Sequence, residues 1–420
     1  MPHEAGIAIV GATGAVGREV LVLLEARGIS PSRVKPLASA RSAGAILPYG
    51  DSELTVRELS AGSFAGCSLA IFAADAATAR EFCPLAVRAG AFVVDNSSAF
   101  RMDPDVPLIV PEVNGAAWRR GGPGRAPSEP GRPAANSRAH GSGDAMARPG
   151  APGRLVANPN CTTIILLVAI EPLRRAFGIE AIDVATYQAV SGAGLAGMEE
   201  LLEQTRSCLT PHGAPGGGPR VFAEPCAFNV FSHDSAVDPA SGVNGEERKV
   251  IDETRKIWAD PAVRVTPTCV RVPVLRAHTE AITVTLRRPA SEAEVREALS
   301  SGQGLEIIDD RAANRFPTPR KAGERDPVLV GRIRPDPGEP PEAGGRSRRW
   351  CLLACADQLR KGAALNAVQI AEFAGALQGG ERGMTGDEAP DAGALRASFG
   401  LHPCSSSTPS PHTPASSAPS

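Results

Sequence analysis

Short apolar runs and longer amphipathic stretches alternate along roughly the first quarter of the chain. An apolar run bounded by Gly, Pro or polar residues predicts a buried strand, and apolar positions at helical spacing predict a helix. The predicted order is strand 7–10, helix 16–26, strand 34–38, strand 69–72, helix 76–89 and strand 92–95. Because strands that alternate with helices form parallel, doubly wound sheets, we predict an α/β fold with a Rossmann-type first domain.

A different pattern begins after residue 182. Strand patterns surround helical ones, and the last strand pattern shows clear apolar–polar alternation, which is typical of a sheet with one covered face. We therefore predict an α+β second domain with a largely antiparallel sheet. A final helical pattern is expected to return to the first domain. The strand patterns lie at 184–189, 268–272 and 281–286, and the helical patterns lie at 198–209, 246–258 and 358–377.

Two segments and the C-terminal tail lack hydrophobic periodicity. They are rich in Gly, Pro, Arg, Ala or Ser and cannot bury enough apolar surface to offset the entropy of ordering. RNA binding by their arginines is less favoured than a solvated linker, since no aromatic residues are interleaved. The expected organisation is 1–155 as the first domain with a disordered insertion at 119–154, 156–355 as the second with a low-complexity loop at 334–348, 356–380 as a returning C-terminal helix, and 381–420 as a disordered tail.

Composition narrows the classes of function. The chain has 420 residues, a formal net charge of -2 and no basic stripe, so neither nucleic acid nor a membrane surface is expected as a partner and a small-molecule substrate is. Nine cysteines without repeated CxxC spacing do not fit a secreted disulfide framework, and Cys351 and Cys355 are expected to be packing residues on a strand-to-helix segment. With neither a cleavable signal nor a membrane-length apolar run, a cytoplasmic protein is expected. No metal site is expected.

One cysteine, Cys161, has a placement that favours chemistry. It follows Asn160 and precedes Thr162, and the apolar run 164–170 predicts a buried helix with the cysteine in its first turn. Backbone N–H groups and the positive end of the helix dipole stabilise a thiolate and lower its pKa. A buried structural cysteine is the alternative, but it would not need the polar Asn and Thr neighbours. We therefore predict a nucleophile.

A glycine-rich turn between Gly11 and Gly17 follows the first predicted strand and opens the first predicted helix. Free backbone N–H groups bind a dinucleotide pyrophosphate in that context, although GxxGxxG is a weaker pattern than GxGxxG and a simple turn is the alternative. An NAD-selective site would carry Asp or Glu after the second strand, whereas an arginine and serines here suit a 2′-phosphate. NADP is therefore the predicted cofactor. Its predicted contacts are Gly11, Thr13, Gly14, Ala15, Val16, Arg41 and Ser42.

Nine motifs occur in one order along the chain: GATGAVG, SARSAG, DNSSAFR, VPEVN, NPNCTT, QAVSGAG, EERK, CVRVPVLRAHTE and KGAALNAVQIAE. With them the chain resembles the aspartate-β-semialdehyde dehydrogenase family over residues 7–118, 155–333 and 350–375. The resemblance implies a glyceraldehyde-3-phosphate dehydrogenase-like fold, with a catalytic and dimerisation domain that forms a homodimer. It implies reversible, NADPH-dependent reductive dephosphorylation of L-4-aspartyl phosphate to L-aspartate 4-semialdehyde, with inorganic phosphate released, in lysine (diaminopimelate), threonine, methionine and isoleucine biosynthesis.

The resemblance also implies roles for individual residues. Cys161 is the nucleophile that forms an acyl thioester, and His278 is the general acid/base, for which an imidazole has a suitable pKa. Arg271 offers a planar fork to a substrate carboxylate, and a bend expected at Pro273 allows it to face one pocket with His278. Gln188 orients the substrate near the thioester.

Charged and amide residues complete the implied site. Glu246 receives the substrate amino group, and Lys249, on the same helical face, binds phosphate together with Arg101. An exposed ion pair would give Glu246 and Lys249 the same spacing. The Asn160 amide is expected to assist the oxyanion. The implied contacts on the nicotinamide side and on the last helix are Ser191, Gly192 and Asn366, with a helix-surface asparagine as the alternative for the last.

Neighbouring arginines and the other histidines are explained without a function. Arg276 and Arg287 fit surface salt bridges. The histidines interpreted as polar surface or core residues are His3, His140, His212, His233, His402 and His412.

Three alternative functions are weaker. N-acetyl-γ-glutamyl-phosphate reductase shares the fold, cofactor and thioester chemistry but has a different cysteine motif. A catalytically silent homologue acting as a binding subunit would usually have lost the nucleophile or the base. A regulatory NADP-sensing protein would not need a nucleophile beside a carboxylate-binding arginine.

Overall fold

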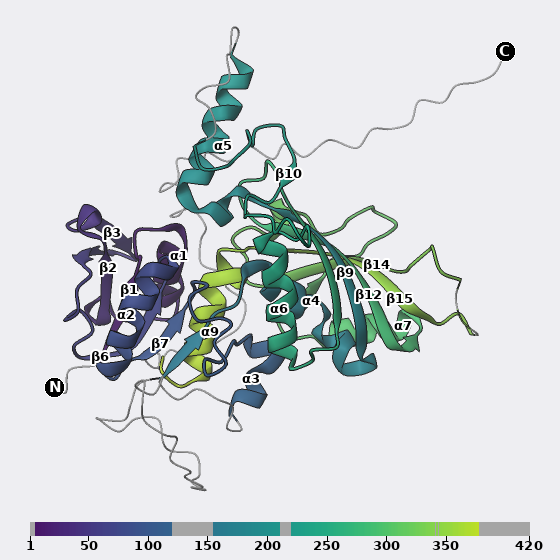
Figure 1. Ribbon diagram of the computed structural model, residues 1–420, viewed down its shortest axis with the longest axis horizontal. Helices are drawn as coiled ribbons and strands as arrows, with labels where there is room; N and C mark the ends of the chain where they lie inside the picture. The colour runs from purple at the N-terminus through teal and green to yellow at the C-terminus, as the bar shows by residue number, and fades with distance from the viewer. Residues whose placement is uncertain (1–4, 120–153, 211–219, 341, 343, 378–420) are drawn as a thin grey trace, which may run out of the picture. The chain divides into compact units, whose positions relative to one another are not determined.

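The parallel sheet predicted for the N-terminal part is present in the computed structural model, which describes residues 5–119, 154–210, 220–340, 342 and 344–377 (Figure 1). Every neighbouring pair in this sheet is parallel. The strand order changes direction at β1, and open α/β sheets bind ligands outside the carboxyl ends of their strands at such a point. The strands, in spatial order, are β5 (Arg57–Glu58), β2 (Val34–Ala38), β1 (Gly6–Val10), β6 (Cys67–Phe72), β7 (Phe92–Asp95) and β8 (Leu155–Ala157).

Successive residues of β1 point to opposite faces of the sheet. Ile7 and Ile9 pack in one core with apolar residues of the first and last helices, whereas Ala8 and Val10 pack in another with those of the second helix. Both faces are therefore covered, which explains why the strand is apolar throughout. The other elements of this part are α1 (Ala15–Ala26), η1 (Pro31–Arg33), η2 (Ala40–Ser42), β3 (Ile46–Tyr49), β4 (Ser52–Thr55), α2 (Ala76–Arg88) and α3 (Pro111–Arg119).

A seven-stranded sheet forms the second part. Its pairs are antiparallel except for two parallel ones, β11 with β9 and β13 with β14. The prediction of an α+β part with a largely antiparallel sheet is confirmed, with two parallel pairs that the apolar–polar alternation does not reveal. The order is β10 (Phe231–Ser232), β11 (Arg264–Arg271), β9 (Ile179–Gln188), β12 (His278–Ala290), β15 (Ser347–Ala356), β14 (Val328–Pro335) and β13 (Leu305–Ile307).

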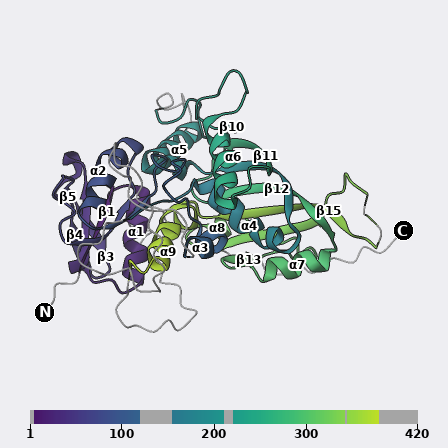
Figure 2. The same ribbon diagram turned by 60° about the horizontal axis from the view of Figure 1, so that its bottom comes forward.

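Two helices lie against this sheet, α6 beside β11 and α4 beside β12 (Figure 2). A capping box fixes the start of α6, because Asn244 Oδ1 accepts the N–H of Glu247 and Glu247 Oε2 accepts the N–H of Asn244, both at 2.9 Å. The helices of this part are α4 (Cys161–Phe177), η3 (Val190–Ala193), α5 (Gly194–Leu209), α6 (Gly245–Trp258), α7 (Glu292–Ser300) and α8 (Pro319–Ala322).

Four predictions of local structure need correction. The helix expected at 358–377 is divided into one π-helical turn, η4 (Arg360–Ala364), and α9 (Leu365–Phe373), which contacts α1, α3 and β7. The loop expected at 334–348 is shorter, because Pro335 of β14 pairs with Trp350 of β15. Cys351 and Cys355 both lie within β15 rather than at a strand-to-helix junction. The insertion predicted at 119–154 begins one residue too early, because Arg119 still belongs to α3. Its residues 120–153 and the predicted tail 381–420 lie outside the described residues.

Candidate active site

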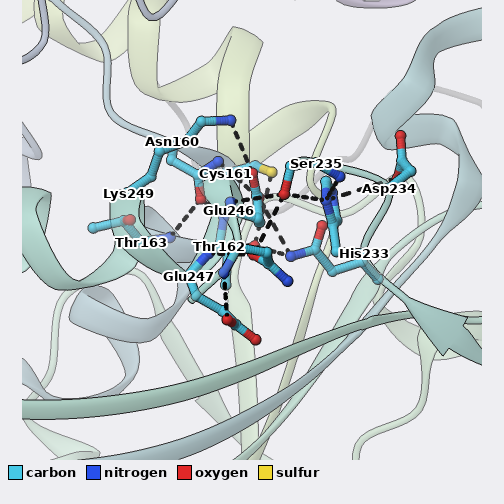
Figure 3. Close-up of polar contacts among 12 residues, drawn as sticks. Asn160, Cys161, Thr162, Thr163, His233, Asp234, Ser235, Glu246, Glu247 and Lys249 are labelled. Carbon is cyan, nitrogen blue, oxygen red and sulfur yellow. Dashed lines mark hydrogen bonds and ion pairs between the residues drawn. The ribbon is translucent and has the colours of Figure 1, made fainter. Parts of the chain in front are cut away.

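Cys161 is the first residue of α4 (Figure 3). The side chain of Asn160 caps the helix, because its Oδ1 accepts the N–H groups of Thr162 and Thr163 at 3.1 and 3.3 Å. The residues that follow are buried and apolar, so the helix is anchored in the core with the sulfur at its N-terminal end. One of the two N–H groups of the Asn160 amide donates to Glu246 Oε1 at 2.9 Å.

The sheet edge beside Cys161 carries three more of the predicted residues. Gln188 ends β9, Arg271 ends β11, and His278 begins β12. Because β9 and β11 are parallel and β12 is antiparallel to β9, two strand ends and one strand start meet at this edge. His278 Nε2 lies 3.5 Å from Cys161 Sγ. A thiol and an imidazole are thus within reach of proton transfer.

Burial and charge set the protonation of this pair. Burial, reinforced by the charge of Glu246, raises the pKa of Cys161 to about 11, although Arg101 and Lys249 act in the opposite direction. Burial lowers the pKa of His278 to about 3. A neutral thiol therefore faces a neutral imidazole near neutral pH. The helix dipole predicts a lowered thiol pKa, whereas burial, the largest influence on this group, raises it.

Backbone groups hold the imidazole in place. The N–H of Ala189 donates to His278 Nδ1 at 3.0 Å, so the proton of a neutral ring is assigned to Nε2, the nitrogen that faces the sulfur. Ala277, just before His278, has a left-handed φ of 74°. Its N–H donates to Gln358 Oε1 at 2.8 Å, a contact that helps to hold this unfavourable conformation.

Arg271 is 3% exposed and already has partners. Its Nη1 donates to the carbonyl of Ala189 at 3.1 Å, and its Nη2 donates to Asp234 Oδ1 at 2.8 Å and to His233 Nε2 at 2.9 Å. The ring of Phe222 lies against the guanidinium, with its centroid 5.4 Å from Cζ. His233, which the sequence does not distinguish from a surface or core histidine, therefore lies in the site.

Glu246 is buried at the start of α6 (Figure 3). Its Oε1 accepts from Asn160 Nδ2 at 2.9 Å and from Gln188 Nε2 at 3.3 Å, and its Oε2 accepts from Lys249 Nζ at 3.0 Å. Burial alone would raise the pKa of Glu246, but Lys249, His233 and the Asn160 amide lower it to about 2, so the carboxylate is ionised. The pair with Lys249 is part of the site rather than an isolated surface ion pair.

Arg101, from the loop after β7, is buried beside Asn158, three residues before the nucleophile. Its Nη1 donates to Glu253 Oε1 at 3.1 Å, and two further nitrogens donate to backbone carbonyls. The second oxygen of Glu253 accepts the N–H of Asn160 at 2.6 Å. Glu253 therefore bridges the predicted phosphate-binding arginine and the residue that caps the nucleophile's helix.

The π-helical turn η4 packs against Cys161 from the far end of the chain. A Cβ added at Gly362 would lie 2.9 Å from the Cβ of Cys161, so only the bare backbone fits there. Gln358, just before η4, donates from Nε2 to the hydroxyl of Ser191. Ser191 is 1% exposed, so this predicted cofactor contact lies inside the protein.

Gly192 borders the space between two reactive groups. A Cβ added there would lie 3.1 Å from Arg271 Nη1 and 3.7 Å from His278 Nε2. A side chain at this position would therefore crowd both groups.

Asn366 is buried, so its interpretation as a helix-surface residue is wrong. Its Nδ2 donates to a backbone carbonyl at 3.0 Å and to Asn158 Oδ1 at 2.7 Å, and its Oδ1 accepts from Lys361 Nζ at 2.9 Å. The amide holds η4 and α9 next to the strand that leads into the nucleophile.

The glycine turn after β1 fits a dinucleotide. Gly11 has a φ of 80°, and a Cβ there would lie 2.4 Å from the carbonyl oxygen of Ala73. A Cβ at Gly17 would lie 2.2 Å from the carbonyl oxygen of Gly11, and Gly14 precedes α1 without a side-chain cap. The first N–H groups of α1 are thus left for a pyrophosphate. Of the remaining predicted contacts, Thr13 lies in this turn, Ala15 and Val16 begin α1, and Arg41 and Ser42 lie in η2.

Arg276 lies in a buried ionic network, and the surface salt bridge expected for it is wrong. Its Nη2 donates to Glu19 Oε2 at 2.7 Å and its Nε donates to Asp357 Oδ2 at 2.5 Å. Arg360 donates to the other oxygen of Glu19 at 2.7 Å. Glu19 belongs to α1, and Arg276 lies two residues before His278, so the network joins the cofactor helix to the catalytic segment.

Sequence reasoning missed four residues of the site. Glu253 has a detectable signal, since it follows Glu246 by seven residues and shares its helical face. His233, Asp234 and Gly362 have none, because tertiary contacts alone bring them to the site.

Within the described ranges, no group of three or more His, Cys, Asp or Glu side chains is placed to hold a metal ion. No helix in the part of the chain that the structure describes is both long and apolar enough to span a bilayer. The remaining histidines of the sequence analysis lie outside the described residues: His3, His140, His212, His402 and His412.

Two family models match the chain. The model of the semialdehyde dehydrogenase NAD binding domain matches residues 6–120, and that of the semialdehyde dehydrogenase dimerisation domain matches residues 170–361. The first match contains the glycine turn, and the second contains Gln188, Glu246, Arg271 and His278.

Named relatives match over almost their entire lengths. The aspartate-semialdehyde dehydrogenase of Synechocystis sp. is 41% identical over 89% of this chain and 98% of its own. That of Aquifex aeolicus is 40% identical over 87% and 97%. The crystal structure of aspartate semialdehyde dehydrogenase II from Vibrio cholerae complexed with ASA has a TM-score of 0.74 and 37% identity, over 88% of this chain and 98% of that one.

Proposed function

The chain belongs to the aspartate-semialdehyde dehydrogenase family, and we propose that it catalyses the reversible, NADPH-dependent reductive dephosphorylation of L-4-aspartyl phosphate to L-aspartate 4-semialdehyde. The observation that carries this proposal is the 3.5 Å contact between Cys161 Sγ and His278 Nε2 at the sheet edge that also holds Arg271. A thiol, an imidazole and a guanidinium in one site are the groups that acyl transfer from a carboxylate-bearing substrate requires.

Cys161 is the proposed nucleophile. The thiol loses its proton to the leaving phosphate, its sulfur attacks the acyl carbon, the bond to the phosphate oxygen breaks, and the acyl group remains on the sulfur as a thioester. A bound nicotinamide supplies the hydride that reduces this thioester. The carbon–sulfur bond of the resulting adduct then breaks, which releases the aldehyde and restores the thiolate.

His278 is the proposed acid and base. Nε2 carries the proton of the neutral ring and faces the sulfur, so it donates a hydrogen bond to the thiolate or to the oxygen of the adduct. In the oxidative direction the ring acts as the base from its other neutral tautomer, in which the proton lies on Nδ1 and Nε2 accepts the proton of the adduct hydroxyl as the hydride departs. The Ala189 N–H, which donates to Nδ1, favours the tautomer with the proton on Nε2, so this contact is given up when the ring acts as the base.

Arg101 and Lys249 are the proposed phosphate ligands. Both charges lower the pKa of the Cys161 thiol, which supports their placement close to the sulfur, where a phosphate dianion would leave. Each remains held by a carboxylate, Arg101 by Glu253 and Lys249 by Glu246. Arg271 is the proposed ligand of the substrate carboxylate, Glu246 that of its amino group, and Gln188 orients the acyl group.

An NAD(P)-binding domain is present, and we propose NADP as the preferred cofactor. Arg41 and Ser42 follow β2, where an acidic residue would favour NAD, and Arg41 is exposed and available for a 2′-phosphate. One structural relative, the enzyme of Candida albicans, is described as a complex with NADP. Ser191, Gly192 and Asn366 stay as proposed contacts near the nicotinamide and the last helix.

We also propose a homodimer, which the match to a dimerisation domain supports. The proposed domain limits are those of the sequence analysis; the family match at 6–120 lies within the proposed first domain, and the match at 170–361 extends beyond the proposed limit at 355. Free thiols at every described cysteine suit a reducing compartment, and we propose the cytoplasm.

The test is the oxidative assay. Purified protein with L-aspartate 4-semialdehyde, inorganic phosphate and NADP should form NADPH, and omission of phosphate should stop turnover after the thioester forms. Activity with N-acetyl-γ-glutamyl semialdehyde in place of the aspartate compound would favour the reductase alternative. No turnover with either aldehyde would support a silent binding subunit.

A further inference from the structure

Arg271 cannot bind a carboxylate through two parallel hydrogen bonds as it stands. A guanidinium has five N–H groups. A carboxylate can bind through two parallel hydrogen bonds at either of two edges, and each of these edges uses one N–H of Nη2. Both hydrogens of Nη2 are taken, one by Asp234 Oδ1 at 2.8 Å and one by His233 Nε2 at 2.9 Å, in the His233 tautomer whose proton lies on Nδ1, 3.2 Å from Ser235 Oγ. Arg271 Nε is buried and has no partner among the described residues. An incoming carboxylate must therefore displace one of the two groups on Nη2.

Of the two partners of Nη2, Asp234 is the one that a substrate carboxylate displaces more easily. Its side chain is 26% exposed, against 10% for that of His233. It lies in the loop between β10 and α6, and its contact with Arg271 is a single ion pair. Burial opposes ionisation, but the hydrogen bond and charge of Arg271 keep the pKa of Asp234 below its usual value, so Asp234 presents a negative charge at the site.

Glu246, the other carboxylate of the site, is less free to bind a new cation. Its side chain is 4% exposed, and both of its oxygens accept hydrogen bonds from Asn160, Gln188 and Lys249. A substrate ammonium that met only Glu246 would have to compete with three donors. A more exposed carboxylate beside the carboxylate-binding arginine is the easier partner.

We propose that Asp234 recognises the α-ammonium group of the substrate by exchanging ion pairs with it. This inference rests on the proposed function. The substrate carboxylate takes the place of Asp234 on Arg271, and the ammonium group on the same carbon pairs with the displaced Asp234. One internal ion pair is exchanged for two with the ligand, and no charge is left alone. Glu246 adds a second negative charge behind the ammonium.

The same exchange makes Asp234 a specificity residue. A substrate with the carboxylate but without the amino group would also displace Asp234 from Arg271. It would then leave Asp234 unpaired beside a second carboxylate, which is unfavourable in a partly buried site. The site therefore selects an α-amino acid over a plain carboxylic acid of the same length.

The experiment compares L-aspartate 4-semialdehyde with succinate semialdehyde, which lacks the amino group, in the phosphate- and NADP-dependent assay. Asp234→Asn keeps an oxygen that accepts from Arg271 but removes the charge. We expect the ratio of kcat/KM for the two aldehydes to fall at least about tenfold, mainly through a higher KM for the amino substrate, because a charged hydrogen bond is lost. Asp238→Asn is the matched control. Asp238 lies on the same loop, is exposed and bonds only within its own turn, so the ratio should not change.

An unchanged ratio in Asp234→Asn, or an equal loss with both aldehydes, would overturn the proposal and leave Asp234 as a structural support of Arg271. If the Asn variant fails to bind cofactor or to fold, Asp234→Ser is measured with the same criterion. A wild-type protein inactive on the aspartate compound would instead refute the proposed function, so the two failures are distinguishable.

Discussion

One methyl group at Gly362 should disable the site without unfolding the protein. The Cβ of Gly362→Ala would lie 2.9 Å from Cys161 Cβ, 3.2 Å from Gln358 Cβ and 3.3 Å from Cys161 Cα. Non-bonded carbon atoms prefer separations of about 3.5–4.0 Å, so η4 and the start of α4 must move apart by roughly 0.6–1 Å. Cys161 is held by the first turn of its helix, so no flexible chain end absorbs this displacement.

The displacement matters because the sulfur and Nε2 of His278 are 3.5 Å apart, at the outer limit of a useful contact. A shift of about 1 Å in reacting groups costs roughly 10²-fold in rate. Overpacking of this kind costs about 1–3 kcal/mol in the free energy of unfolding, less than the roughly 5–15 kcal/mol of a typical domain. We therefore expect kcat to fall about 100-fold in a folded protein, with a smaller change in the KM for the semialdehyde.

NADPH formation and urea unfolding, measured side by side, test this reasoning. Gly62→Ala is the matched control, because a Cβ added there meets nothing within 4 Å. A Gly362→Ala enzyme with the kcat of the wild type would refute the claim that η4 positions the nucleophile. A variant that lost activity only because it unfolded would refute the estimate of stability.

Three other predictions concern the nucleophile, the cofactor and pH. Cys161→Ser should retain the fold but only a trace of turnover, and near-normal activity would exclude the thioester. Arg41→Ala should lower kcat/KM with NADP at least about tenfold through the lost charged hydrogen bond and leave NAD use nearly unchanged, whereas equal losses would give Arg41 a structural role. Burial lowers the pKa of His278 from 6.5 to about 3, so the unfolded chain takes up this proton first as the pH falls, and stability present above pH 6.5 is lost toward pH 3. In urea titrations, the free energy of unfolding of His278→Gln should change with pH by about 1.4 kcal/mol per pH unit less than that of the wild type. Identical slopes would show that His278 is not buried as a neutral ring.

The range of an interaction decides whether the sequence reveals it. β1, α1, β2 and β7 follow from local periodicity, and the pattern locates their ends to within about one residue. Motif order predicts the reacting residues of the candidate site for a similar reason, since each motif is a short segment. The division of the last helix escapes the pattern, because one π-helical turn leaves the apolar spacing almost unchanged.

The burial of charged groups cannot be predicted from the sequence for the opposite reason, because it depends on long-range contacts. Arg276 has the neighbours of a surface residue in sequence, but its partner Glu19 lies 257 positions away. Asp234 and His233 reach Arg271 from 37 and 38 positions away, through a loop with no periodicity of its own. Even a complete secondary-structure prediction would not have paired these groups, because pairing them requires the tertiary packing of the sheet and its loops.

The packing of η4 against the nucleophile has a consequence for how the protein is made. The residues that complete the site come from the end of the described chain, since Gly362 meets Cys161 and Asn158 donates to the carbonyl of Ala363, 205 positions later. During synthesis, Cys161 emerges long before these partners exist. A ribosome stalled before η4 would therefore carry both the glycine turn and the thiol but no assembled site. The thiol gains its working geometry only after nearly all of the folded chain has been translated, and such late, long-range contacts are also those that slow folding.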